Sequence, residues 1–397
     1  MKAGWEVKTL GEVCFIARGG SPRPIQEFLT DDANGVNWIK ISDATASDKY
    51  IFETKQKIKP SGISRSRLVN EGDFLLSNSM SFGRPYIMKT TGCIHDGWLV
   101  LSEYDKYFDQ GFLYHLLSSP VVFEQFDKLA AGSTVRNLNI ELASRVVLPI
   151  PPLPEQQRIV ALLDAAFASI ATAKANTEQN LKNAHALFDS YLHEVFSKRG
   201  EDWEEKTLGD VLLKTETVDP TKKPNNEFIY LDVSSVNKET KEIENPTVLL
   251  GKNAPSRARK LVKTNDVIFA TVRPTHSRVA LITEEYNEQV CSTGYFVLRA
   301  KKFINHNLIF YFLLTKNFNK QMELLQKGAS YPAVTDNEVK GVYINFPKSK
   351  NEQEIIVNKL NELKIETQRL ETLYQRKLQA LDELKKSLLH KAFNGEL

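Results

Sequence analysis

The chain has 397 residues, more than one hydrophobic core usually supports, so two domains are expected. With 42% hydrophobic and 25% charged residues it has the composition of a globular protein, which excludes a disordered or fibrous chain. The net charge of +3 is weak support for an anionic partner, and three cysteines without a Cys-x-x-Cys pair indicate neither a disulfide framework nor a zinc site.

The first ten residues contain no apolar segment typical of a signal peptide, and the sequence contains no run of 18 or more apolar residues. These features predict a cytoplasmic protein that does not enter a membrane.

One long internal repeat organises the sequence. The segment Trp5–Val13 returns as Trp203–Val211 with seven identities in nine positions, at a spacing of 198 residues. Short apolar runs that are typical of strands follow in both copies: Trp38–Ser42 with Tyr230–Ser234, Gly72–Leu76 with Asn265–Phe269, and Trp98–Leu101 with Tyr295–Leu298. A repeat of this length predicts two duplicated domains rather than a solenoid of small units.

Matching segments lie toward the end of each copy. They begin at Gly132 and Gly328 and lead through Pro151 and Pro347 to Gln157 and Gln353, each pair 196 residues apart.

Beyond them, a heptad pattern predicts two long helices of roughly 60 Å each. Its positions are Ile159, Leu163, Ala166, Ile170, Ala173, Thr177, Asn180, Ala184, Leu187 and Tyr191 in the first copy, and Ile356, Leu360, Leu363, Thr367, Leu370, Tyr374, Lys377, Leu381, Leu384 and Leu388 in the second. Each helix carries one apolar stripe, so we expect the two to pack against each other, and to be antiparallel because the first ends where the second copy begins. The alternative is that they are ordinary surface helices of two larger domains.

Each copy contains a basic segment without acidic residues, which suits contact with phosphates. The candidates are Lys59, Arg65 and Arg67 in the first copy and Lys252, Arg257, Arg259 and Lys260 in the second. A solvated basic loop is the alternative, but its return at the same place in both copies favours DNA contact.

A second pair of candidate loops, Ser77–Arg84 and Thr271–Arg278, follows equivalent strands. The loops differ in sequence, as expected of two readers of different half-sites, although unselected drift would produce the same difference. Their side chains with groups able to reach base edges are Asn78, Arg84, Arg273, His276 and Arg278.

Motifs for catalysis are missing from the sequence. Asp219-Pro220-Thr221 does not match an adenine-methyltransferase motif, and no Gly-x-x-x-x-Gly-Lys-Ser/Thr loop is present for ATP. The histidines are not spaced as metal ligands, so we expect neither a catalytic residue nor a metal site.

The sequence resembles the specificity subunits of type I restriction-modification systems along essentially its whole length. The resemblance rests on the Trp-x-x-Lys-Thr-Leu-Gly openings at residues 5 and 203, on Pro151–Gln157 before a long helix, and on the ending Leu388–Leu397. It implies an α/β fold with two target-recognition domains, residues 1–153 and 200–349, related by a pseudo-twofold axis and separated by an antiparallel coiled coil of two helical spacers, residues 154–199 and 350–397.

The same resemblance implies that each domain reads one half of a split site on double-stranded DNA. The helices would set the spacer and dock two modification (methyltransferase) subunits, which restriction (translocase and nuclease) subunits then join. No cofactor is expected in this chain, because S-adenosylmethionine, ATP and Mg would be bound by the partner subunits. The residues expected to dock partners are Pro151, Pro154, Gln157, Pro347 and Gln353.

The second copy departs from the family pattern at Lys348-Ser349-Lys350, where the first has Pro152-Leu153-Pro154, and at Asn351, where the first has Glu155. This departure puts one docking surface in doubt. Two other interpretations stay open from the sequence: a non-enzymatic coiled-coil scaffold, and a DNA-modifying enzyme that acts without partners.

Overall fold

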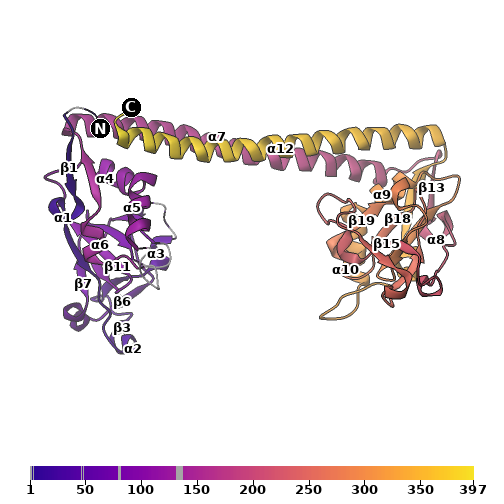
Figure 1. The fold of residues 1–397 in the computed structure, drawn as a ribbon, viewed down its shortest axis with the longest axis horizontal. Helices are drawn as coiled ribbons and strands as arrows, with labels where there is room; N and C mark the ends of the chain where they lie inside the picture. The colour runs from indigo at the N-terminus through magenta and orange to yellow at the C-terminus, as the bar shows by residue number, and fades with distance from the viewer. Residues whose placement is uncertain (1, 3, 46, 48, 79–81, 131–136) are drawn as a thin grey trace. The chain divides into compact units, whose positions relative to one another are not determined.

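The structure is a computed structural model that describes residues 2, 4–45, 47, 49–78, 82–130 and 137–397 (Figure 1). Gly132 of the repeat therefore lies outside the described residues. The chain divides into two compact units, which we call unit 1 (residues 1–177 and 376–397) and unit 2 (residues 178–375). Each unit is mixed α/β, as the sequence resemblance implied.

Unit 1 contains two five-stranded sheets, in the orders β3-β6-β4-β10-β7 and β2-β11-β8-β9-β5, and the two-stranded pair β1-β12. The strands are β1 Glu6–Thr9, β2 Phe15–Arg18, β3 Leu29–Thr30, β4 Val36–Ile39, β5 Tyr50–Ile51, β6 Gln56–Ile58, β7 Arg67–Val69, β8 Phe74–Ser77, β9 Pro85–Met88, β10 Gly92–Ile94, β11 Trp98–Ser102 and β12 Val147–Ile150. The helices are α1 Leu10–Val13, α2 Ile25–Phe28, α3 Ile41–Thr45, the 3-10 helix η1 Pro60–Arg65, α4 Gln110–Leu117, α5 Pro120–Ala130 and α6 Ile140–Ser144.

Unit 2 repeats this plan with two four-stranded sheets, β14-β21-β18-β19 and β16-β15-β20-β17, and the pair β13-β22. The strands are β13 Trp203–Thr207, β14 Leu212–Leu213, β15 Glu227–Leu231, β16 Thr247–Leu250, β17 Ala258–Leu261, β18 Val267–Ala270, β19 Val279–Leu281, β20 Val290–Ser292, β21 Tyr295–Ala300 and β22 Tyr343–Pro347. The helices are α8 Leu208–Val211, η2 Pro220–Lys222, η3 Val233–Ser235, η4 Gly251–Asn253, η5 Pro274–His276, η6 Glu284–Tyr286, α9 His306–Leu313, α10 Lys316–Leu325 and α11 Asp336–Lys340.

The repeated opening motif forms a strand and a short helix in both units. Strands β1 and β13 pair antiparallel with β12 and β22, the strands that lead into the long helices. At the start of α1 the Thr9 backbone N–H donates to the Glu12 carboxylate at 2.7 Å, and Thr207 and Asp210 form the same capping box at α8. The motif recurs because both units need the same entry into their cores.

The two long helices are α7, Leu153–Ser197, and α12, Lys350–Asn394, close to the predicted spacers 154–199 and 350–397. Each unit holds part of each helix, so the units do not coincide with the predicted domain divisions. Packing is antiparallel in both: Lys174 pairs with Asp382 in unit 1, and His185 Nε2 lies 2.9 Å from Glu371 Oε1 in unit 2. This confirms the predicted antiparallel pair.

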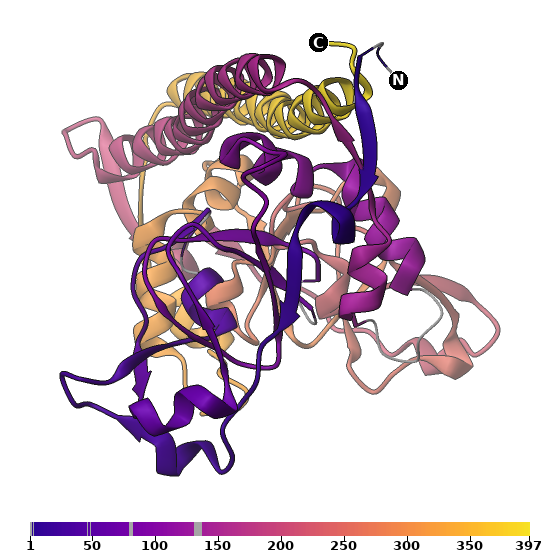
Figure 2. The same ribbon diagram turned by 90° about the vertical axis from the view of Figure 1, so that its left-hand side faces the viewer.

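The two chain ends meet within unit 1, as Figure 2 shows. Lys2 Nζ lies 2.9 Å from Glu155 Oε1, and Arg158 Nη2 donates to the Leu397 carbonyl oxygen at 2.8 Å. These contacts tie the last residues of the chain to the first turns of α7.

The predicted heptad stripe is wrong at four positions. Asn180, Leu187, Lys377 and Leu384 are exposed; Leu187 keeps 62% of its surface in solvent. Near its carboxyl end α7 packs Phe188 and Leu192 on the core of unit 2, so its buried face turns from the heptad line toward the recognition domain. A straight helix drifts relative to a 3.5-residue repeat, which permits this change of face.

By length and composition alone, α7 could cross a membrane, since one 18-residue window has a mean hydropathy of 1.3. A single such helix is weak support for a membrane span. The apolar side chains Ile159 and Leu163 are only 1% exposed in the core of unit 1, which accounts for part of this hydropathy.

A buried glutamine joins the start of each long helix to its unit. Gln156 Nε2 donates to the carbonyl oxygens of Tyr107 (2.8 Å) and Pro151 (2.9 Å), and its Oε1 accepts from the Asp109 N–H at 2.8 Å.

Gln353 makes the equivalent bonds in unit 2, to Phe303, Pro347 and Asn305, at 3.0, 2.8 and 2.7 Å. We call these two sets the glutamine joints. The repeat therefore pairs Gln353 with Gln156, and the sequence alignment with Gln157 was wrong by one residue.

A second contact between helix and domain differs in the two units. In unit 1, His115 Nε2 lies 2.7 Å from Asp164 Oδ1, and burial lowers the pKa of His115 while Asp164 raises it. In unit 2 the corresponding pair is Tyr311 and Asn361, whose Oη–Oδ1 distance is 2.6 Å. Both pairs fasten the first turns of a long helix to the helix α4 or α9 beside it.

The glutamine joint in unit 1 can be tested by two adjacent substitutions. Gln156→Ala removes the partner of the half-buried Asp109 N–H and of two carbonyl groups, which we expect to lower the free energy of unfolding by roughly 3 kcal/mol. Urea unfolding followed by circular dichroism measures this. Gln157→Ala is the matched control, since that side chain is exposed and its loss should cost less than about 0.5 kcal/mol. Equal losses of unfolding free energy in the two variants would show that the Gln156 bonds do not stabilise unit 1.

Candidate nucleic-acid interface

The two units build the same tight turn between two central strands. In unit 1 it is His95–Gly97, between β10 and β11, where the Gly97 N–H donates to His95 Nδ1 at 2.9 Å. In unit 2 it is Ser292–Gly294, where the Gly294 N–H donates to Ser292 Oγ at 3.2 Å. We call these the equivalent turns.

The basic segment of unit 1 lies beside its turn, because Ser66 Oγ donates to the Ile94 carbonyl oxygen at 3.0 Å. All three predicted phosphate-binding side chains there are exposed. Lys59 Nζ donates to the Glu27 carbonyl oxygen at 2.8 Å, Arg65 lies 5.4 Å from the ring centre of Phe28, and Arg67 begins β7. The segment keeps its charges at the surface.

The basic segment of unit 2 is placed in the same way, since the Thr293 N–H donates to the Arg257 carbonyl oxygen at 2.8 Å. Lys252 and Arg257 are exposed, whereas Arg259 is half-buried and 3.3 Å from Asp219 Oδ1. The prediction for Lys260 needs correction: its Nζ is bonded to Asp336 Oδ2 at 2.7 Å and to the Tyr295 carbonyl oxygen at 2.6 Å. That ammonium is already neutralised inside the unit.

The loop after β18 in unit 2 presents two exposed side chains, Arg273 and His276. Arg273 has a left-handed backbone with φ of 50°, its N–H donates to the Pro332 carbonyl oxygen at 2.7 Å, and its guanidinium lies 5.6 Å from the ring centre of Tyr331. Tyr331 is 73% exposed, so the pair stands in solvent, where a guanidinium can bond two acceptors of a guanine.

Arg278 does not extend from this loop as predicted. It is half-buried, and its Nη1 donates to the Val236 carbonyl oxygen. Its guanidinium therefore supports the loop rather than pointing into solvent.

In unit 1 the corresponding loop places Arg84 at the surface, 5.1 Å from the ring centre of Tyr86, while residues 79–81 lie outside the described residues. Asn78 was predicted to reach base edges, and this is wrong for the conformation seen. It is 1% exposed, and its Nδ2 donates to the Asp96 carbonyl oxygen at 2.9 Å. Asn78 holds the turn of unit 1 instead.

Some of the predicted docking residues are buried and others are exposed. Pro151, Pro347 and Gln353 are buried, so their side chains cannot form a docking surface, and the sequence prediction is corrected for them. Pro154 and Gln157 are exposed at the start of α7. The glutamine joint of unit 2 is complete despite Lys348–Lys350, so the departure from the family pattern leaves that helix start intact.

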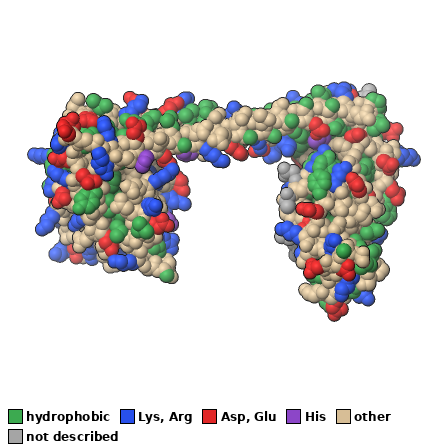
Figure 3. Space-filling view, turned by 180° about the vertical axis from the view of Figure 1, so that it is seen from behind, with side chains coloured by type: hydrophobic (Ala, Val, Ile, Leu, Met, Phe, Trp, Pro, Cys, Tyr) green, Lys and Arg blue, Asp and Glu red, His purple; other side chains and the backbone are tan. Residues whose placement is uncertain are grey.

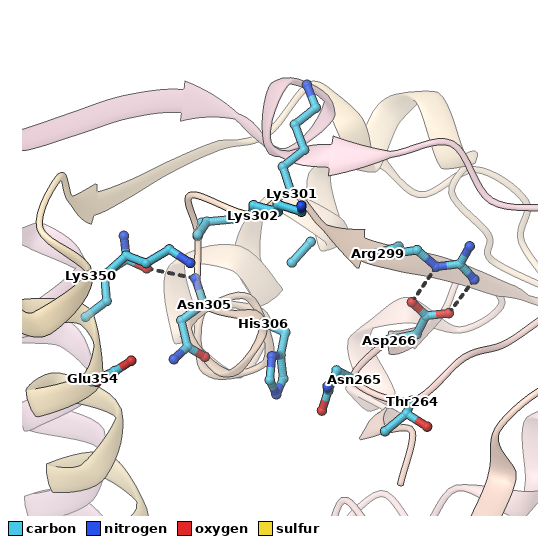
Figure 4. Close-up of a pocket in the computed structure, with 13 residues that line it drawn as sticks. Thr264, Asn265, Asp266, Arg299, Lys301, Lys302, Asn305, His306, Lys350 and Glu354 are labelled. Atoms are coloured by element: carbon cyan, nitrogen blue, oxygen red, sulfur yellow. Dashed lines mark hydrogen bonds and ion pairs between the residues drawn. The ribbon is translucent and has the colours of Figure 1, made fainter. Parts of the chain in front are cut away.

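A pocket of about 310 Å³ lies beside this joint in unit 2, lined by Lys301, Lys302, His306 and Lys350 among others (Figure 4). The Arg299 guanidinium in its wall makes two bonds to the Asp266 carboxylate, at 2.9 and 2.8 Å. Of its lining residues, Asn305 and Gln353 are bonded to each other in the glutamine joint of unit 2.

Charge over the rest of the surface is mixed. Figure 3 shows Lys and Arg side chains scattered among acidic ones on the visible face of each unit. Within the described residues no group of three or more His, Cys, Asp or Glu could hold a metal ion, and all three cysteines are free and buried.

Sequence reasoning missed three side chains: Asp96 in the turn of unit 1, Arg23, whose Nη2 lies 3.8 Å from Asp96 Oδ2, and Tyr331 beside Arg273. The comparison with Thr293, at the same place in the repeat, was the available signal, because it shows a charge difference between otherwise equivalent turns.

The family model and the curated relatives that match this chain all point to one family. Residues 2–183 and 200–379 both match the type I restriction modification DNA specificity domain. The chain is 22% identical over 422 residues to the EcoKI specificity subunit of Escherichia coli K12, covering 99% of this chain and 89% of that protein. A shorter match of 25% identity over 192 residues to the Haemophilus influenzae HindI specificity subunit covers 44% of this chain and 39% of the relative.

Among solved structures, a chain from work on complex assembly and conformational transition of the type I R-M system superposes with a TM-score of 0.80. It has 20% sequence identity and covers 100% of this chain and 99% of the other, so it supports the fold. The two family matches are stronger support than the shared fold, because together they include most of the residues of the chain. The chain therefore belongs to the type I restriction-modification DNA specificity family.

Proposed function

We propose that each unit reads one half of a bipartite DNA site and that partner subunits carry out the chemistry. The observation that carries this proposal is the repetition of one scaffold with different surface groups. In both equivalent turns the glycine carbonyl oxygen accepts from the backbone N–H of the residue after the core strand, Asn78 or Thr271, yet one turn presents Asp96 and the other Thr293. Duplicated readers of two different half-sites require this combination of shared scaffold and divergent surface.

The exposed cations beside the turns supply affinity without sequence preference. Lys59, Arg65 and Arg67 in unit 1, and Lys252 and Arg257 in unit 2, would neutralise phosphates and release counterions. Arg273, stacked near Tyr331, would read a base edge in the second half-site, since a guanidinium makes two bonds to guanine O6 and N7.

The long helices would set the spacing between the half-sites and dock two methyltransferase subunits, with Pro154 and Gln157 at one docking surface. S-adenosylmethionine would be bound by those subunits, and ATP and Mg by the restriction subunits that join them. The chain would then work in the cytoplasm, without catalytic activity of its own. A coiled-coil scaffold without DNA recognition has no support from the family matches.

The proposal predicts that the units read independently. Replacing residues 14–131 with the equivalent segment of another family member should change the first half of the recognised sequence and leave the second half unchanged. Selection of bound duplexes from a randomised library measures both halves at once. A change in both halves would show that the units do not read separately.

Phosphate contact predicts a change in salt dependence. Arg65→Ala and Arg257→Ala should each weaken binding to all sequences alike and reduce the slope of log affinity against log salt by about 0.9 per lost contact. Titrations at several salt concentrations measure the slope.

Lys260→Ala is the matched control for charge, because its ammonium is bonded within unit 2 and should leave the slope unchanged. Arg273→Ala should instead alter the preferred base in the second half-site. Unchanged slopes for Arg65→Ala and Arg257→Ala would assign these residues to inert surface.

A further inference from the structure

The Asp96 side chain is an acidic group with two arginines, Arg18 and Arg23, beside it. Arg23 also lines a hollow of about 450 Å³ next to the turn, together with Lys40, Trp38 and His95. A carboxylate repels phosphates, so it opposes backbone binding at this place. Its presence requires another explanation.

The turn holds Asp96 in a defined position from three sides. Arg18 Nε and Asn78 Nδ2 both donate to its backbone carbonyl oxygen, at 3.0 and 2.9 Å. Ser21 Oγ donates to its Oδ1 at 2.7 Å. The buried Asn78 amide is itself out of reach of DNA, but it holds the backbone of Asp96 in place. This contact explains why a polar side chain is buried here.

Close approach of the preceding chain completes this support. A Cβ atom at Gly19 would stand 2.0 Å from the His95 carbonyl oxygen, so only glycine allows the segment after β2 to pass the turn. That passage brings Ser21 to the carboxylate.

Within the part of the chain that the structure describes, the second carboxylate oxygen of Asp96 accepts no hydrogen bond and is open to a ligand. Oδ1 is occupied by Ser21, whereas Oδ2 has Arg23 Nη2 at 3.8 Å, beyond hydrogen-bond distance, and 49% of the side chain is exposed. The Ser21 hydrogen bond, as the largest cause, lowers the pKa of Asp96, so the carboxylate is ionised near neutral pH. An ionised carboxylate only accepts hydrogen bonds.

In the major groove the donors are the exocyclic amino groups of cytosine (N4) and adenine (N6). We infer that Asp96 reads such an amino group in the first half-site, with Asn78 and Ser21 as positioning residues and Arg23 as a phosphate contact beside it. This inference rests on the proposed function, and it adds the residue and the chemical group that it recognises. Unit 2, with the neutral Thr293 in the equivalent turn, would not apply the same preference.

The test is selection from a randomised duplex library by the complex assembled with methyltransferase subunits, which carries either the unchanged chain or one of its variants. The unchanged chain should prefer cytosine or adenine at one position of the first half-site. Asp96→Ala should reduce that preference about tenfold, as expected for one lost base contact, and leave the second half-site unchanged. Thermal unfolding checks that the variants remain folded.

Two further variants sharpen the result. Asp96→Asn distinguishes the bases, because an amide pairs with adenine N6 and N7: a cytosine preference should move toward adenine, whereas an adenine preference should persist. Arg23→Ala is the matched control and should weaken binding to all sequences alike.

An unaltered preference in Asp96→Ala, with both half-sites still selected, would overturn the inference alone. A preference that Arg23→Ala changes and Asp96→Ala does not would also overturn it. An unchanged chain that selects no sequence would overturn the proposed function, and this inference with it.

Discussion

The glutamine joints are the constraint on which the rest of the structure depends. Gln156 and Gln353 are buried side chains that satisfy one N–H and two carbonyl groups each, at the point where a sheet strand gives way to a long helix. A buried amide loses more when a bond is broken than an exposed one, so the helix start has one defined orientation on its own unit. The pairs His115–Asp164 and Tyr311–Asn361 fasten each helix to its unit again about two turns further along.

A fixed helix start matters for recognition because the surface of each unit is then fixed relative to its helices. Strands β8 and β18 lead directly from the core to the loops that carry Arg84 and Arg273, and the equivalent turns lie beside those loops. Thr271 and Asn78 show how one scaffold serves two surfaces: their backbone N–H groups donate to Gly294 and Gly97, at 2.8 and 3.1 Å, while their side chains differ. The scaffold is shared, and the groups that it presents are not.

Much of the fold could be predicted from the sequence, because repetition and periodicity are visible without structure. The strands β8, β11, β18 and β21, and the two antiparallel helices, follow from apolar patterns at a common spacing, whereas the pairing of β8 with β11 and of β18 with β21 was seen only in the structure. The site was harder to predict. Asn78 and Lys260 carry suitable groups but are committed internally by long-range bonds, to Asp96 and to Asp336, that no local pattern reveals.

The glutamine joints could not be predicted from the sequence for the same reason, because they too depend on contacts between distant residues. Two adjacent glutamines, Gln156 and Gln157, differ only in which face of α7 they occupy, and the packing of unit 1 decides that face. Asp96 is a candidate for base recognition because Ser21 and Asn78 hold it in position, and these residues are 75 and 18 positions away in the sequence. Such clusters cannot be recognised from the sequence because their members are far apart in it. Comparison of equivalent positions in the two copies of the repeat indicates where they lie.

We propose that the long helices, each bonded to its own unit at a glutamine joint, determine the spacing at which the two readers meet DNA. Four residues inserted between Ala175 and Asn180 lengthen α7 by about 6 Å, close to one turn, and base pairs are about 3.4 Å apart. Selection on duplexes with randomised spacers, using the assembled complex, should show a preferred spacer longer by one or two base pairs with both half-sites unchanged. An unchanged spacer at undiminished affinity would contradict the account, because the helices would then hold partners without measuring DNA.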